Sequence, residues 1–277
     1  MKHAFFVGLA STLAATAATG CSNPPPDNAD DNWAPDVQWV QAWGDDFDGP
    51  EGSAPDPTNW NVVTNGMPYN GELEYYTARR DNSFLDGDGH LVLRAIEESY
   101  MGSAYTSGRL ETGGLREFEY GRFEARMKVP RGPGFWPAFW LLGSSGPWPL
   151  CGEIDVLELR GSLPAQAHST LHGPQYSGGD GLTKMYPLPS GTFADDFHRF
   201  TLEWTHDGVR WLIDDVPYHA ETRAAIVEKN KAWVFDASFH IILDFAVGGV
   251  YDGPPTSATQ FPGDLVVDYV KTWRIGP

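Results

Sequence analysis

Residues 151–160, CGEIDVLELR, decide the fold, because three carboxylates interrupt an otherwise apolar run there. A short run rich in aliphatic and β-branched residues predicts a buried strand. Burying a carboxylate without a partner costs free energy. A strand that carries Glu153, Asp155 and Glu158 therefore indicates a functional site.

The spacing of the three carboxylates predicts a β-bulge. Side chains alternate between the two faces of a strand, so Glu153 and Asp155 share a face and Glu158 falls on the other. One bulge between Asp155 and Glu158 returns Glu158 to the shared face, and bulges often lie beside active sites. Ile154 and one of the residues at 156–157 are then expected to pack behind.

This arrangement suits a retaining glycosidase. The Glu153 and Glu158 carboxyls are expected about 5 Å apart, the separation of an acid and a nucleophile in such enzymes. Asp155 between them is expected to hold Glu153 and to keep the pKa values of the group apart. Spacing alone leaves two alternatives open, a solvated strand edge and a calcium site built from the three carboxylates.

Composition limits the partners. The chain has 277 residues and a formal net charge of −18, so nucleic acid and a bare anionic membrane surface are excluded as expected partners. A neutral glycan is favoured over a strongly anionic one for the same reason. Eleven tryptophans fit a sugar-stacking role as well as a core role.

The first residues predict export. Residues 1–20 begin with Lys2 and continue as a short apolar segment of small residues, which is typical of a signal peptide. The small residues before Cys21 resemble a bacterial lipobox. We expect Cys21 to be lipidated and to tether the chain to the cell envelope, with simple secretion as the alternative.

One domain is expected after a linker. Residues 21–36 are rich in Pro, Asn and Asp and predict a flexible linker, followed by a catalytic domain at 37–277. Short strand-like runs separated by turn signals predict an all-β sandwich of two antiparallel sheets. A weak helix is expected at 220–230. Cys151 is expected to be a small buried residue beside the site, and no zinc-type Cys/His spacing is present.

Several ordered motifs resemble one family. GEIDVLE at 152–158, GFWPAFWLLG at 134–143 and HGPQYSGG at 172–179 are similar to segments of glycoside hydrolase family 16, and the resemblance runs from about residue 45 to residue 273. It implies a jelly-roll β-sandwich with a concave substrate cleft. The extra residue between Glu153 and Glu158 resembles the bulged, laminarinase-like branch of the family. That branch implies endo-hydrolysis of 1,3-β-glucan, with mixed 1,3-1,4 links often accepted.

The resemblance also implies roles for the carboxylates and two tryptophans. Glu153 corresponds to the nucleophile, Glu158 to the acid/base and Asp155 to the assisting carboxylate. Trp136 and Trp140 correspond to cleft residues that stack on sugar rings. Both indoles fall on the same face by parity, and Pro137 after Trp136 predicts an edge or cleft position.

Further polar residues are implied as substrate contacts. His172 corresponds to a histidine near the acid/base, in a glycine-rich loop that would leave it exposed enough to act. Arg109 corresponds to an arginine that contacts sugar hydroxyls, and Asn70 corresponds to an asparagine of the substrate cleft. At residue 244 the chain departs from the family pattern, since Asp244 stands where asparagine is usual.

A structural metal is implied away from the cleft. Family members often bind calcium through a residue near the domain start, a carbonyl before an early strand and an aspartate in the last strand. The matching residues are Asp46, Gly89 and Asp268, with Asp46 in place of the usual glutamate. No cofactor is expected for catalysis, and a monomer is expected. Two functional alternatives stay open, a same-family hydrolase of agar-type galactans and a non-catalytic glycan-binding module.

Overall fold

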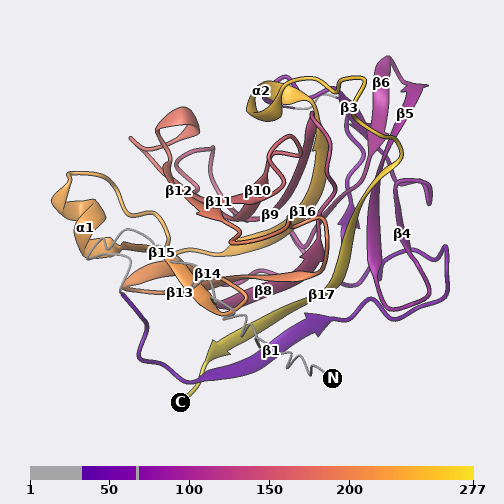
Figure 1. The fold of residues 1–277 in the computed structure, drawn as a ribbon. Coiled ribbons are helices and arrows are strands. Elements are labelled where there is room, and N and C mark those ends of the chain that lie inside the picture. The colour runs from indigo at the N-terminus through magenta and orange to yellow at the C-terminus, as the bar shows by residue number, and fades with distance from the viewer. Residues whose placement is uncertain (1–32, 67–68) are drawn as a thin grey trace, which may run out of the picture.

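Two β-sheets stack on one another and account for nearly all of the regular structure in the computed structural model, which describes residues 33–66 and 69–277 (Figure 1). The first half of the chain contains β1 (Trp39–Asp45), β2 (Asn61–Val62), β3 (Glu74–Tyr76), β4 (Ser83–Leu85), β5 (Leu91–Tyr100), β6 (Ser103–Ser107), β7 (Arg109–Glu111), β8 (Gly121–Lys128) and β9 (Phe135–Gly143). The second half contains β10 (Glu153–Leu159), β11 (Gln166–His172), η2 (Gly178–Asp180), β12 (Leu182–Pro187), β13 (His198–Thr205), β14 (Gly208–Ile213), β15 (Val216–Thr222), α1 (Arg223–Glu228), β16 (Phe239–Val247), α2 (Gly249–Asp252) and β17 (Gly263–Ile275).

The strand order confirms the predicted sandwich. The larger sheet runs β15-β14-β13-β8-β17-β5-β6-β3, with β1 joined to β17 and β4 joined to β5. The smaller sheet runs β12-β11-β10-β9-β16-β7-β2. The sheets are antiparallel as predicted except at one edge, where β3 pairs with β6 in parallel. The long connection through β4 and β5 permits that direction, because parallel neighbours need a crossover of a dozen or more residues.

The expected helix at 220–230 is shorter than predicted. Strand β15 continues to Thr222, and α1 spans only Arg223–Glu228. Thr222 begins the helix as its N-cap, since its hydroxyl accepts a hydrogen bond from the backbone N–H of Ala225 at 3.2 Å. No helix among the described residues has the length and apolarity needed to cross a bilayer.

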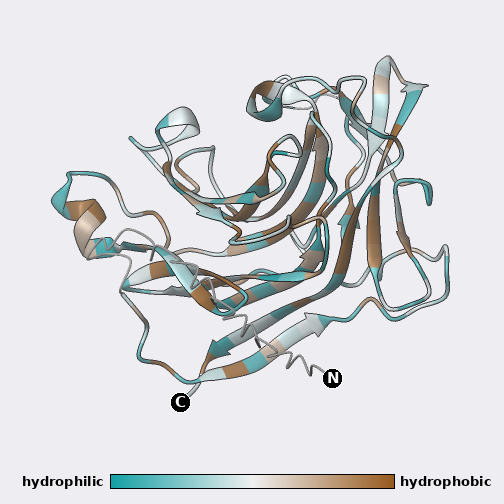
Figure 2. Cartoon of the chain, viewed as in Figure 1, coloured by the Kyte–Doolittle hydropathy of each residue, from teal (hydrophilic) through white to brown (hydrophobic). Residues whose placement is uncertain are grey.

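Alternation along β9 separates the core from the cleft. Phe139 and Leu141 are fully buried between the sheets, whereas Trp136 and Trp140 line a cleft on the opposite face. Figure 2 shows the same alternation of hydrophobic and hydrophilic residues along the strands. β9 is a central strand, so the edge position that Pro137 suggested is wrong and the cleft position is confirmed.

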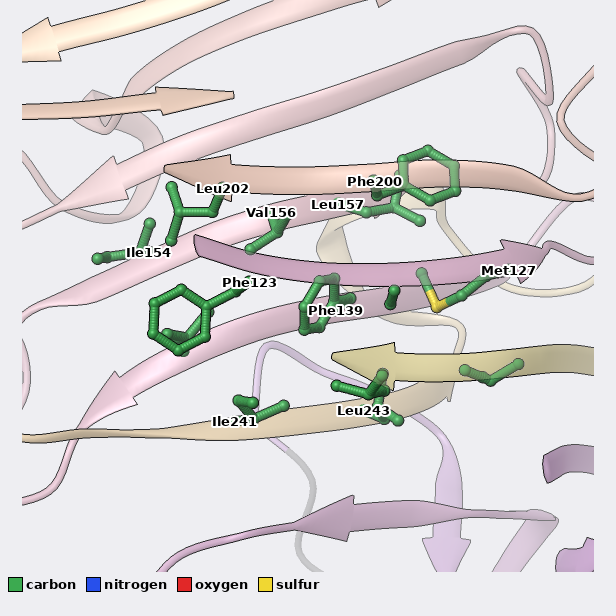
Figure 3. Packing of buried hydrophobic residues seen from close by; sticks show 14 of the residues in the cluster. Phe123, Met127, Phe139, Ile154, Val156, Leu157, Phe200, Leu202, Ile241 and Leu243 are labelled. Carbon is green, nitrogen blue, oxygen red and sulfur yellow. The ribbon is translucent and has the colours of Figure 1, made fainter. Parts of the chain in front are cut away.

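The predicted bulge is present in β10. Asp155 lies opposite Thr170 of β11 and Glu158 lies opposite His168, so two residues of β10 face one residue of its neighbour. The pairing with β9 shifts at the same place. Both Val156 and Leu157 are buried in the core, rather than one of them (Figure 3). The bulge thus places two successive apolar side chains behind the site and returns Glu158 to the cleft face.

A hydrogen bond from the opposite sheet supports the bulge. The indole N–H of Trp211, in β14, donates to the backbone carbonyl of Asp155 at 2.8 Å. A bulge leaves part of the ladder unpaired, and an unpaired buried carbonyl is costly. Trp211 is fully buried and stacks on His219 with 4.3 Å between ring centroids. The donor is therefore fixed in place by its own packing.

We expect the Trp211→Phe variant to lose about 1–3 kcal/mol of unfolding free energy, because it leaves the Asp155 carbonyl buried without its donor. Urea denaturation followed by circular dichroism measures the change. Trp273→Phe is the matched control, since Trp273 is only half-buried. Equal losses in the two variants would contradict a specific role of the Trp211 hydrogen bond.

Candidate active site

A cleft of about 590 Å³ lies over the smaller sheet. Its lining is drawn mainly from β3, β7, β9, β10 and β16, of which Figure 1 labels all but β7. The cleft gathers most of the residues predicted from the sequence: Glu153, Asp155, Glu158, Trp136, Trp140, Arg109 and Asn70. One surface therefore holds the three carboxylates and four of the expected sugar contacts.

Glu158 carries the environment of a general acid. The indole N–H of Trp136 donates to Glu158 Oε1 at 3.1 Å. Burial and the neighbouring Asp155 charge raise the pKa of Glu158 to about 8, while His172 and the Trp136 hydrogen bond act in the opposite direction. A carboxyl with this pKa keeps its proton at neutral pH and can donate it.

Glu153 and Asp155 share a histidine. His172 Nε2 lies 3.6 Å from Glu153 Oε1 and 3.2 Å from Asp155 Oδ2. The second contact is electrostatic rather than an aligned hydrogen bond, because Asp155 Oδ2 has no hydrogen-bond partner among the described residues. Burial raises the pKa of both carboxyls above their ordinary values, and Asp155 adds to the rise at Glu153. His172 opposes the rise at Glu153, as does a hydrogen bond to Trp148.

One expectation for His172 is wrong, because the imidazole is only 8% exposed at the end of strand β11 rather than exposed in a loop. It contacts Glu153 and Asp155, and its charge also acts on the acid/base Glu158. The antiparallel register explains the placement, because Glu153 faces His172 across the ladder and Glu158 faces His168. The sequence does not show that register without knowledge of the turn between the strands.

The acid/base end of the cleft includes residues that the sequence analysis missed. The Tyr251 ring lies against Trp136 with 4.8 Å between centroids, and the Arg160 guanidinium lies 4.4 Å from the centre of the Tyr251 ring. Burial and Arg160 lower the pKa of His168, which keeps that imidazole neutral. The spacing of His168 and His172, four residues apart on one strand face, is the signal that could have marked the first of them.

The cleft also contains a buried carboxylate, Asp244 of β16, which lies on the other side of Ala138 from Glu158. The Trp140 indole N–H donates to Asp244 Oδ1 at 2.8 Å, and the Tyr76 hydroxyl donates to Oδ2 at 3.1 Å. The Arg109 guanidinium lies 5.1 Å from the Trp140 ring centre. Tyr76 carries no motif of its own, so nothing in the sequence marked it.

Asn70 borders a second pair of carboxyls. Its side-chain amide donates to Glu72 Oε1 at 3.4 Å. Burial, followed by the charges of Glu74 and Asp244, raises the pKa of Glu72 to about 9, and burial raises the pKa of Glu74 to about 7. Glu74 is fully buried and accepts a hydrogen bond from the Val247 backbone N–H at 2.7 Å. At neutral pH at least one carboxyl of this pair is protonated.

The fold does not bring the three β10 carboxylates together as a calcium site. In the described chain, the group with metal-like proximity consists of Glu153, Asp155 and His172, whose ligand atoms lie within 4.8 Å of one another. Glu158 is absent from this group and bonds Trp136 instead. Calcium prefers oxygen ligands, so a set that includes an imidazole suits it poorly.

The residues predicted for structural calcium lie near one another on the other sheet. Asp45 pairs with Val270 and Leu91 pairs with Val267, which brings the neighbouring Asp46, Gly89 and Asp268 together. The Asp46 carboxylate, however, lies 2.7 Å from Lys271 Nζ, and the Asp268 carboxylate lies 2.6 Å from Arg126 Nη1.

The Asp46 backbone carbonyl is close to Gly89, since a Cβ on Gly89 would lie 3.9 Å from it. The backbones of Asp46 and Gly89 are therefore close together, while the carboxylates of Asp46 and Asp268 already have cationic partners.

Of the two cysteines, Cys151 lies within the described residues. Cys151 is free and buried next to the site, as expected, and burial raises the pKa of its thiol. Cys21, the predicted lipidation site, lies outside the described residues.

The chain is similar to known β-glucanases. It is 37% identical over 265 residues to a β-glucanase of Rhodothermus marinus, covering 92% of this chain and 91% of that protein. It is 35% identical over 257 residues to a glucan endo-1,3-β-glucosidase of Cryptopygus antarcticus, covering 85% and 92%. The catalytic domain of an endo-1,3-β-glucanase (laminarinase) from Thermotoga petrophila superposes with a TM-score of 0.82 at 39% identity, covering 87% of this chain and all of that one.

The family model for glycosyl hydrolases family 16 matches residues 71–270, which include the five strands β3, β7, β9, β10 and β16 that line the cleft. With the bulged strand and its three cleft carboxylates, the chain belongs to glycosyl hydrolases family 16.

Proposed function

We propose that the protein is a retaining endo-β-glucanase that hydrolyses 1,3-linked glucans of the laminarin type, with mixed 1,3-1,4 glucans as further substrates. The observation that carries the proposal is the bulge, which places Glu153, Asp155 and Glu158 on one cleft face with Glu158 suited to hold a proton. A reducing-end assay against laminarin, lichenan, curdlan and agarose tests the substrate. Release of sugar from agarose alone would favour the galactanase alternative.

In the first step Glu158 protonates the leaving oxygen while Glu153 attacks the anomeric carbon. The Trp136 hydrogen bond fixes the acid in the cleft, since it reaches Glu158 Oε1 directly. Water then attacks the glycosyl-enzyme, with Glu158 acting as the base, and releases Glu153. His172 contacts both Glu153 and Asp155, and Asp155 and His172 together hold the nucleophile in position.

Aromatic rings position the substrate. Trp136 and Trp140 present their rings on the same cleft face, two positions either side of Ala138. Rings spaced in this way can hold successive sugars of a glucan chain, and holding the reacting sugar in place lowers the barrier. Trp148 lines the cleft as well and contacts Glu153.

The alkaline side of the pH profile is expected to report Glu158. Because the acid must be protonated and its pKa is raised to about 8, kcat/KM for laminarin should stay high below that pH and fall as the pH rises through it. Initial rates measured across the pH range define the alkaline limb of this profile. Glu158→Gln should lower kcat about 10²–10⁴-fold. A profile already falling near pH 5 would contradict Glu158 as the acid.

The stereochemistry of the product tests the double displacement. Retention predicts that the β-anomer of the new reducing end appears first, because two inversions occur at the same carbon. Proton NMR during laminarin hydrolysis distinguishes the anomers before they equilibrate. Glu153→Gln should abolish this release while its thermal unfolding stays cooperative. Prompt formation of the α-anomer would rule out Glu153 as a nucleophile.

We also propose that Asp46, Gly89 and Asp268 hold a structural calcium ion, supported by the convergence of their backbones. Calcium added to chelator-treated protein should raise the melting temperature by about 5 °C, because a ligand that binds only the folded state stabilises it. Differential scanning calorimetry measures this, with magnesium as the control. Equal shifts with both ions would count against a calcium site.

Export and tethering remain proposals that rest on sequence. The apolar segment at 1–20 and the residues before Cys21 support a lipoprotein of the bacterial envelope that acts as a monomer. Metabolic labelling with a fatty-acid analogue, compared with Cys21→Ser, tests the tether. Incorporation of label into the variant would show that Cys21 is not the acceptor.

A further inference from the structure

Asp244 is a buried acid in the substrate cleft with no part in the mechanism described above. It lies in the middle of β16, is 7% exposed and borders the cleft. The family resemblance implies asparagine at this position, so the carboxylate is a property of this chain. A buried carboxylate without a compensating function is costly.

Both oxygens of Asp244 accept a hydrogen bond from a cleft side chain. Trp140 donates to Oδ1 at 2.8 Å from β9, and Tyr76 donates to Oδ2 at 3.1 Å from β3. Tyr76 is almost fully buried, and the Trp140 ring has Arg109 beside it. The carboxylate thus joins the smaller sheet to the edge strand of the larger sheet beneath the cleft.

Asparagine would not make the same pair of bonds. A carboxylate accepts at both ends, whereas a carboxamide accepts at one end and donates at the other. With asparagine, Trp140 could keep its acceptor, but Tyr76 would have to turn its hydroxyl and accept. Hydrogen bonds to an ionised acceptor are also the stronger kind. An ionised aspartate therefore accepts from both donors without any rearrangement of Trp140 or Tyr76.

We propose that Asp244 is a positioning residue, which fixes Trp140 and Tyr76 in the cleft and supplies a buried negative charge that asparagine could not supply. The proposal rests on the glucanase function proposed above, and it concerns a position where the family resemblance implies asparagine. Asp244 itself does not touch the reacting carbon.

Charged groups face Asp244 from three neighbouring elements and from the segment before β3. Arg109 of β7 attracts it, while Asp155 of β10, Glu74 of β3 and the adjacent Glu72 repel it. Burial raises the pKa of Asp244, and Arg109, Trp140 and Tyr76 oppose that rise. The Asp244 charge in turn contributes to the raised pKa of Glu158. Removing it should make the acid lose its proton at lower pH.

Three variants separate positioning from charge. Asp244→Asn removes the charge and keeps the shape and the Trp140 acceptor. Asp244→Ala removes the charge and both acceptors. Tyr76→Phe keeps the charge and removes one donor. Asp196→Asn is the matched control for charge, because Asp196 is exposed and does not line the cleft.

In Asp244→Asn the alkaline limb of kcat/KM should move to lower pH by about half a pH unit or less, because the Asp244 charge is the smallest of the influences that raise the pKa of Glu158. Asp244→Ala should show the same shift and about a tenfold rise in KM, because Trp140 loses its anchor. Tyr76→Phe should keep the alkaline limb of the wild type. The Asp196→Asn profile should match the wild type.

The proposal is overturned if the alkaline limb of Asp244→Asn coincides with that of Asp196→Asn, or if KM is unchanged in a folded Asp244→Ala protein. Should the alanine variant fail to fold, the asparagine and phenylalanine variants decide the charge effect alone. Failure of the proposed function is distinguishable, because wild-type protein would then release no sugar. In that case the Trp140 indole proton, followed by NMR in wild type and Asp244→Ala, still reports the hydrogen bond.

Discussion

The bulge in β10 is the constraint on which the site depends. An unbroken strand would turn Glu158 into the apolar core and would bring one of Val156 and Leu157 out of it. Burial of an aliphatic side chain stabilises a protein by about 1.5–3 kcal/mol, and an ionised carboxyl in the core would cost more than that gain. The bulge keeps Glu158 on the cleft face and both aliphatic side chains in the core. Trp211 donates a hydrogen bond to the backbone carbonyl of Asp155 at the bulge.

The cleft can contain many carboxyl side chains because most of them accept a hydrogen bond or stay protonated. Trp136, Trp140 and Tyr76 donate to Glu158 and Asp244, and Arg109 is the guanidinium among the lining side chains of the described chain. Burial raises the pKa values of Glu72, Glu153, Asp155 and Glu158 together. Fewer of these groups are therefore ionised at neutral pH than the sequence suggests. A neutral glucan meets a cleft whose charge is much smaller than its number of carboxyls.

Sequence patterns were sufficient for the parts of the fold that depend on local alternation. Parity placed Trp136 and Trp140 on one face, and the extra residue before Glu158 required the bulge. Register and long-range contacts were beyond local patterns. The position of His172 opposite Glu153 could not be derived, because the β10–β11 pairing depends on the turn at 160–165. Tyr76 meets Asp244 across 168 residues of sequence, and no local rule indicates that contact.

The bulge also limits how this chain could change over evolutionary time. Loss of one residue between Asp155 and Glu158 would convert β10 to a regular strand in which both glutamates still share a face. The same loss would remove a side chain from the layer that contains Val156 and Leu157 and would leave Trp211 facing a rearranged carbonyl. A single deletion would therefore require compensating changes on both sheets. Insertions and deletions should be far rarer at 155–158 than in the loops on either side, whatever substrate selection favours.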